Sequence, residues 1–207
     1  MIEPRQCGLV LLAAGASTRM GQPKQLLEID GVPLVRRAAL AALASSARPI
    51  VVVLGANATL IRPQLADLFV LLVENSRWPE GMGSSLRCGM QAMLSAAPAL
   101  DSVIVALADQ PQFSGAIIEQ LRARQRETGN SIVSSSGAAQ VGPPALFLRQ
   151  HFPELLACGG DTGARTLIRA NATNLASVDL GEQPDLDTPA DYRRLLEKQK
   201  TGPTPGQ

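Results

Sequence analysis

The sequence predicts an α/β fold in which a mostly parallel, mixed sheet carries helices on both faces. Short, continuously apolar runs alternate with longer helical segments, as strands buried on both faces require. Hydrophobic residues make up 45% of the 207 residues and charged residues 18%, which is typical of a globular chain. Aromatic residues reach only 3%, so Ala, Leu and Val must fill the core.

The expected strands are apolar runs that end at a turn residue, such as IVVVL before Gly55. Strands are predicted at residues 8–13, 50–54, 69–73, 103–107, 131–134 and 145–148. Helices are predicted at residues 34–45, 58–65, 83–96, 114–127 and 164–169. Ligands of such sheets bind at the carboxyl ends of the strands, so the segments after the first and fourth strands are the informative ones.

The length suits a single domain, predicted over residues 1–197. Residues 198–207, KQKTGPTPGQ, are expected to form a disordered tail. No internal repeat is visible.

The charge balance and the cysteine content argue against several classes of protein. Nineteen basic and 18 acidic residues leave a net charge of +1, with neither a basic footprint for nucleic acid nor a polybasic membrane patch. The apolar run near the N-terminus is too short to span a membrane. Cys7, Cys88 and Cys158 form no CxxC pair, and His151 is the single histidine, which argues against a zinc site. Free thiols in a reducing cytoplasm are expected.

The segment 12–24, LAAGASTRMGQPK, has the composition of an anion-binding loop. Gly15 and Gly21 permit close backbone approach, and consecutive N–H groups can form a concave site for a triphosphate. Arg19 and Lys24 add two cations. Neither GxxxxGK[ST] nor GxGxxG occurs here. The residues expected to bind nucleotide in this segment are Leu12, Ala13, Ala14, Gly15, Ser17, Arg19 and Lys24.

Two carboxylate-bearing segments suggest a metal site. Asp109 follows the apolar strand 103–107 directly, and Mg²⁺ is usually held by one or two carboxylates plus phosphate oxygens. An N-cap role for the next helix is the alternative. In DLDTPAD, residues 185–191, a capping box explains Thr188 and Asp191 but leaves the other two aspartates unused. Those two, Asp185 and Asp187, could complete a metal site with Asp109.

Two further segments are less specific. Residues 74–89, ENSRWPEGMGSSLRCG, precede or begin a helix whose free N–H groups could contact a base or phosphate. Trp78 there suits loop packing and ligand contact equally. Asp161 is either an acceptor-side residue or a helix N-cap. Arg165 could hold an anionic acceptor or be solvated, and His151 is expected to be structural.

The segment LAAGASTRMGQPK resembles the LAAGxSxRMGxPK signature of the MobA-like nucleotidyltransferases, most closely the molybdenum cofactor cytidylyltransferases. ALADQP, the stretch from residue 75 to 89, GDTGAR and DLDTPAD resemble further motifs of that family, so the resemblance runs from about residue 8 to 192. It implies a three-layer, Rossmann-like nucleotidyltransferase fold. Pro143 departs from the family pattern, in which a polar residue is expected.

The resemblance also implies roles for individual residues. Arg19, Lys24 and Asp109 would be catalytic, and Asp109 with Asp187 would bind Mg²⁺. Further nucleotide contacts would come from Asn75, Gly83 and Ser84. The acceptor side would comprise Asp161, Arg165 and Asp185.

LAAG and the closing PK resemble the branch that uses CTP, and the acceptor would be the molybdopterin form of the molybdenum cofactor. Transient contact with a molybdoenzyme or its chaperone is then expected, without nucleic acid or membrane. Two alternatives stay open: the same chemistry on a sugar or polyol phosphate, and a carrier of the cofactor without catalysis. A dinucleotide-binding oxidoreductase is disfavoured by the missing GxGxxG.

Overall fold

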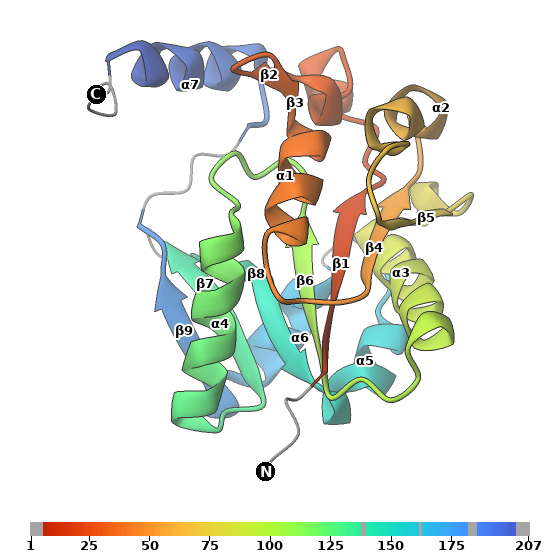
Figure 1. Cartoon of the computed structure of the whole chain (residues 1–207), viewed down its shortest axis with the longest axis vertical. Helices are drawn as coiled ribbons and strands as arrows, with labels where there is room; N and C mark the ends of the chain where they lie inside the picture. The colour runs from red at the N-terminus through yellow and green to blue at the C-terminus, as the bar shows by residue number, and fades with distance from the viewer. Residues whose placement is uncertain (1–5, 138–139, 162, 182–185, 202–207) are drawn as a thin grey trace.

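The computed structural model describes residues 6–137, 140–161, 163–181 and 186–201 and contains a seven-stranded sheet in the order β5-β4-β1-β6-β8-β7-β9 (Figure 1). The strands of this sheet are β1 (Cys7–Ala13), β4 (Ile50–Leu54), β5 (Leu71–Glu74), β6 (Ser102–Leu107), β7 (Ile132–Gly137), β8 (Gln140–Leu148) and β9 (Leu175–Asp179). A separate antiparallel pair comprises β2 (Glu28–Ile29) and β3 (Val32–Pro33). The helices are α1 (Leu34–Leu43), α2 (Ala58–Ile61), α3 (Met82–Ala96), α4 (Gly115–Thr128), α5 (Phe152–Ala157), α6 (Ala164–Ala170) and α7 (Pro189–Thr201).

The seven-stranded sheet is mixed but mostly parallel, as predicted. β1 pairs in parallel with β4 on one side and β6 on the other, with Leu9 opposite both Ile50 and Ile104. β8 is antiparallel to both β6 and β7, whereas β7 and β9 are parallel. The chain therefore needs helical crossovers between most neighbouring strands, which place helices on the two faces.

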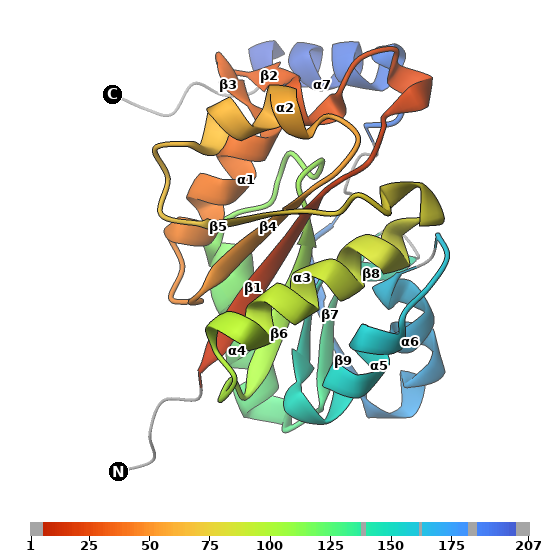
Figure 2. The ribbon, with the colours of Figure 1, turned by 90° about the vertical axis from the view of Figure 1, so that its right-hand side faces the viewer.

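Side chains of β1 alternate between two buried clusters, which makes the molecule three-layered (Figures 1 and 2). Leu9 and Leu11 belong to the cluster that includes the apolar sides of α1 and α4. Val10 and Leu12 belong to the cluster that includes α3, α5 and α6. Both faces are apolar because β1 is covered on both sides, which explains the continuous apolar run of the sequence.

Several predicted boundaries shift. The strand expected at 69–73 begins at Leu71, and Phe69 is almost fully exposed. The helix expected at 58–65 splits into α2 and a 3₁₀ helix, Arg62–Leu65, because Pro63 lacks the N–H group that an α-helix uses. β9 and α5 were not predicted. β9 is an edge strand with mixed burial, so its sequence lacks the apolar run that marks the central strands.

The strand order creates a crevice at the carboxyl ends of β1 and β6. From β1 the chain moves outward through β4 and β5, and then returns to place β6 on the other side of β1. Connections that leave neighbouring strands in opposite directions open a space between them, which is where ligands of such sheets bind. The two segments singled out by the sequence, 12–24 and 106–111, meet there.

The C-terminal helix α7 lies against the N-terminal segment that follows β1 (Figure 2). Leu186, Leu195 and Tyr192 pack with apolar residues from the first segment of the chain, Met20, Leu27, Ile29 and Leu34. Thr188 N–H donates to Asp191, as the predicted capping box requires. α7 reaches Thr201, so it includes residues that the sequence assigned to the tail, while 202–207 lie outside the described residues. No described helix combines the length and apolar character needed to cross a membrane.

Candidate active site

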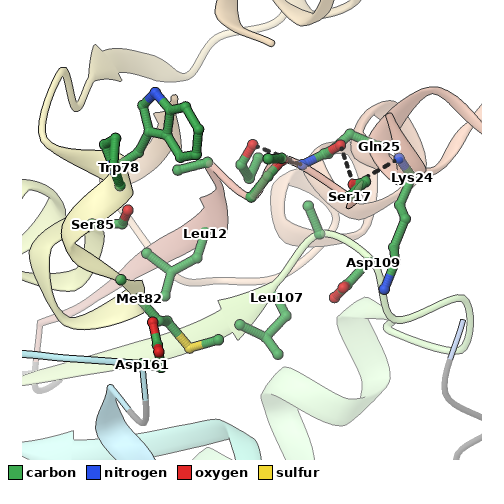
Figure 3. A pocket seen from close by; sticks show the side chains of 17 residues that line it. Leu12, Ser17, Lys24, Gln25, Trp78, Met82, Ser85, Leu107, Asp109 and Asp161 are labelled. Carbon is green, nitrogen blue, oxygen red and sulfur yellow. Dashed lines mark hydrogen bonds between the residues drawn. The ribbon is translucent and has the colours of Figure 1, made fainter. Parts of the chain in front are cut away.

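A cavity of about 380 Å³ opens where β1 and β6 end (Figure 3). In Figure 3, Trp78, Met82 and Asp161 border one side, and Lys24 with Asp109 border the other. The cavity therefore joins both informative segments with the start of α3. Its lining residues are Leu12, Ala13, Ala14, Gly15, Ala16, Ser17, Lys24, Gln25, Trp78, Pro79, Gly81, Met82, Ser85, Leu107, Ala108, Asp109 and Asp161.

The glycine-rich loop forms one wall of this cavity. Leu12, Ala13, Ala14, Gly15 and Ser17, all expected to bind nucleotide, line it. Ser17 adopts the left-handed conformation at φ 57°, which is uncommon outside glycine. Its hydroxyl accepts the Lys24 N–H at 3.0 Å, which closes the loop on itself. The backbone is thus curved in the way that a concave anion site requires.

Lys24 is a nearly buried cation on the cavity wall. Lys24 is the first residue of a 3₁₀ helix, Lys24–Leu26, and its side chain is mostly buried. Its Nζ lies 2.5 Å from an oxygen of Asp187. The other oxygen of Asp187 accepts from Arg19 at 2.7 Å. Three predicted site residues from opposite ends of the sequence therefore form one ion-paired cluster. Arg19 and Asp187 are not among the residues that line the cavity.

Lys24 and Arg19 lower the pKa of Asp187. The hydrogen bond from Lys24 is the largest cause, and the positive charges of Lys24 and Arg19 act in the same direction against partial burial. Asp187 is therefore ionised at neutral pH.

The Asp187 shift predicts an acid-dependent loss of stability. Because the pKa is lower in the folded state, the unfolded chain binds the proton more readily, and acid favours unfolding. In metal-free buffer, wild type should be more stable than Asp187→Asn at neutral pH. The difference should shrink once the pH falls below about 4, the ordinary value for Asp, and vanish below the folded-state pKa. Denaturant unfolding at a series of pH values measures this, and a difference independent of pH would contradict it.

Asp109 lies on the cavity wall immediately after β6 and Ala108, on the same side as Lys24 (Figure 3). Among the described residues, no group of three or more His, Cys, Asp or Glu side chains is arranged to hold a metal. A protein that supplies only one or two carboxylates suits Mg²⁺, whose other ligands are phosphate oxygens and water. Asp109, which lies on the side of Lys24, and Asp187, which is bound to Lys24, fit that pattern.

Asn75, Gly83 and Ser84 are not among the residues that line the cavity. Asn75 donates from Nδ2 to Ser84 Oγ at 2.8 Å and to Ser85 Oγ at 3.0 Å, which ties β5 to the first turn of α3. A Cβ atom on Gly83 would lie 2.6 Å from the backbone of Gly159, so glycine permits the close approach of that loop. The geometry gives these residues a supporting position, and their nucleotide contacts remain predictions.

Of the predicted acceptor residues, only Asp161 is among the described residues that line the cavity. Asp161 lines the cavity on the side of Trp78. Arg165 does not line the cavity. It lies beside Gly142, because a Cβ atom added to Gly142 would be 3.4 Å from the Nε of Arg165. Gln110 donates to the carbonyl oxygen of Pro143 at 2.8 Å and so links the segment after Asp109 to β8. Asp185 lies outside the described residues.

Some lining residues were not predicted. Gln25 is buried and contacts the glycine-rich loop, yet a single glutamine after a lysine carries little signal in a sequence. Met82 and Ser85 reach the cavity because α3 begins beside it. Trp78 packs against the apolar cluster that includes α3 and also lines the cavity, so its contact with a ligand stays a prediction.

None of the three cysteines is among the residues that line the cavity. Cys7, Cys88 and Cys158 are free, as expected, and Cys7 is buried. Burial raises the pKa of all three thiols, so each is protonated at neutral pH.

His151 follows the end of β8 that pairs with the start of β6, whereas the cavity lies at the other end of β6. Its role is expected to be structural. Its Nε2 lies 2.8 Å from Ser131 Oγ and its Nδ1 3.1 Å from Glu154 Oε2. Ser131 and His151 are both buried, and neither lines the cavity beside the glycine-rich loop.

His151→Leu should therefore lower the free energy of unfolding by about 1–3 kcal/mol, the cost of a buried hydroxyl that loses its partner. Nucleotide turnover by the folded fraction should not change. Urea unfolding and pyrophosphate release measure the two quantities. A loss of turnover at unchanged stability would mean that His151 serves the reaction.

A glycine-rich loop with a nearly buried lysine lies at the switch point of a mostly parallel sheet, an arrangement typical of α/β enzymes that bind nucleotides. A family model, the MobA-like NTP transferase domain, matches residues 9–176. The chain belongs to this family and is a nucleotidyltransferase.

The relatives span nearly the whole chain. Nicotine blue oxidoreductase of Paenarthrobacter nicotinovorans is 33% identical over 201 residues, which cover 90% of this chain and 95% of the relative. Purine catabolism protein PucB of Bacillus subtilis (strain 168) is 31% identical over 199 residues, covering 88% and 92%. The crystal structure of Rv0371c of Mycobacterium tuberculosis H37Rv in complex with manganese has a TM-score of 0.77 at 28% identity, covering 93% of this chain and 98% of that one.

Proposed function

We propose that this nucleotidyltransferase transfers CMP from CTP to the terminal phosphate of a molybdopterin-type molybdenum cofactor and releases pyrophosphate. The observation that carries the proposal is the cavity in which the LAAG loop, Lys24 and Asp109 meet. Ala14 of the LAAG pattern lines this cavity. That position supports the preference for CTP implied by the LAAG and PK pattern.

Positioning and charge neutralisation suffice for this reaction. An oxygen of the acceptor phosphate attacks the α-phosphorus of CTP, the bond from that phosphorus to the bridging oxygen breaks, and pyrophosphate departs in line. Loop amides and Arg19 would hold the β- and γ-phosphates. Lys24 would stabilise the charge that develops on the α-phosphate. No covalent intermediate on the protein is required.

Asp109 and Asp187 are the residues that would hold Mg²⁺, which would neutralise charge on the triphosphate. Both oxygens of Asp187 are engaged by Lys24 and Arg19. Each of these oxygens has a second lone pair, so Asp187 could bind a metal ion while it keeps both ion pairs. The manganese complex of Rv0371c supports the use of a divalent ion by a relative with 28% identity.

The acceptor side of the proposal relies on Arg165 and Asp161. Arg165 lies beside Gly142 near the start of β8. Its guanidinium group could hold a phosphate with two hydrogen bonds. A terminal phosphate is shared by the molybdenum cofactor and by sugar or polyol phosphates, so this feature fits both acceptor classes. We propose a cytoplasmic location, which suits the free thiols, and transient contact with a receiving molybdoenzyme or its chaperone.

Pyrophosphate release with Mg²⁺ tests the proposal. CTP, GTP and ATP should be compared, each with and without molybdenum cofactor, and CTP-selective, cofactor-dependent release is expected. Release only with a sugar or polyol phosphate would overturn the acceptor. Cofactor binding without any release would favour a carrier. Since one relative is named an oxidoreductase, NAD(P)H oxidation should be followed in parallel, and a redox turnover without pyrophosphate release would contradict the proposal.

A further inference from the structure

The side chain of Gln25 lies inside the curve of the glycine-rich loop and is only 4% exposed. Its Nε2 donates to the carbonyl oxygens of Gly15 at 2.8 Å and of Ala13 at 3.1 Å. Its Oε1 accepts from the hydroxyl of Ser17 at 3.4 Å. Both N–H groups and the oxygen of the Gln25 carboxamide thus form hydrogen bonds with the same loop.

These bonds determine how the loop peptides are oriented. In a planar trans peptide the C=O and the N–H point in opposite directions. Holding the carbonyls of Ala13 and Gly15 toward Gln25 therefore sets the directions of the N–H groups of Ala14 and Ala16. An anion site needs N–H groups facing the ligand, whereas a carbonyl turned into the cavity would present negative charge to a phosphate.

Gln25 also joins the loop to Lys24. Ser17, in its left-handed conformation, accepts the Lys24 N–H and donates to Gln25, so residues 13–17 and the segment Lys24–Leu26 form one connected unit. A non-glycine residue keeps such a conformation only where its surroundings hold it. Donors held in place before the ligand arrives need no reorganisation during the reaction.

We propose that Gln25 is a positioning residue of the phosphate-binding loop: its carboxamide turns the loop carbonyls away from the nucleotide and keeps Lys24 in register with the loop amides. This inference rests on the proposed role of the loop in binding the triphosphate. It predicts that the amide group of Gln25, and not merely its volume, sets the affinity for phosphates.

The test compares Gln25→Glu and Gln25→Ala with wild type. Gln25→Glu keeps the size and the acceptor for Ser17 but places a carboxylate oxygen against two carbonyl oxygens. Gln125→Glu is a matched control, because Gln125 is a glutamine of similar burial, 6% exposed, on α4 and outside the cavity lining. CTP and inorganic pyrophosphate, each with Mg²⁺, serve as probes. Trp78, the single tryptophan of the chain, lines the cavity and reports binding by fluorescence.

Both Gln25 variants should bind pyrophosphate and CTP at least about tenfold more weakly, the loss expected for two hydrogen bonds. Hydrogen exchange at the amides of residues 14–17 should be faster, while the melting temperature of Gln25→Glu stays close to that of Gln125→Glu. Unchanged affinity, unchanged loop exchange, or an equal affinity loss in Gln125→Glu would overturn the proposal. If wild type prefers another nucleotide to CTP, the base assignment fails, and the pyrophosphate and exchange comparisons still decide the role of Gln25.

Discussion

Lys24→Ala should lower turnover at least about a hundredfold while the protein remains folded. The amine of Lys24 is the nearly buried cation of the cavity wall, and it is fixed between the closed loop and Asp187. A cation that meets developing charge while it is itself nearly buried stabilises the transition state more than one in water can. Steady-state pyrophosphate release at saturating nucleotide measures the loss.

Arg36→Ala is the matched control for this variant. Arg36 is likewise ion-paired to an aspartate, Asp67, at 2.7 Å, but it lies on α1 outside the cavity lining. Removing it should leave turnover unchanged. Near-normal turnover in Lys24→Ala, or an equal loss in Arg36→Ala, would contradict the role of Lys24. Circular dichroism of both variants establishes that the fold survives.

Asp109→Asn should have an effect of similar size, at least about a hundredfold on turnover. The change keeps the shape of the side chain and removes one negative charge from the cavity wall beside Lys24 (Figure 3). A neutral amide is a weaker ligand for a hard divalent cation than a carboxylate is. The variant should therefore also need more Mg²⁺ for half-maximal turnover, which a magnesium titration measures.

Asp101→Asn is the control at the other end of the same strand. Asp101 precedes β6, and its carboxylate accepts the N–H of Gln6 at 2.9 Å, away from the cavity. Its replacement should change neither turnover nor magnesium dependence. If Asp109→Asn keeps the wild-type magnesium dependence while losing activity, Asp109 acts in another way than by holding the metal.

The local sequence was sufficient to predict the layers of the fold and the position of the glycine-rich loop. Apolar runs such as IVVVL are buried on both faces, and this demand acts on each strand separately, so it is visible in a single segment. Glycines at 15 and 21 and the cations at 19 and 24 likewise lie within one loop. LAAGASTRMGQPK and ALADQP could therefore be predicted to form a nucleotide site, and residues of both segments line one cavity.

Only the tertiary structure decided which side chains meet. Asp187 comes from the C-terminal segment, and packing of α7 on the N-terminal segment brings it to Lys24 and Arg19. Gln25 gains its role from the curvature of the loop. Asn75 belongs to a motif that resembles a nucleotide-contacting motif of the family, yet its side chain is buried and donates a hydrogen bond to Ser84 on α3. Such pairings depend on how distant segments pack together. The spacing of side chains along the chain indicates only which residues of one helix or strand share a face.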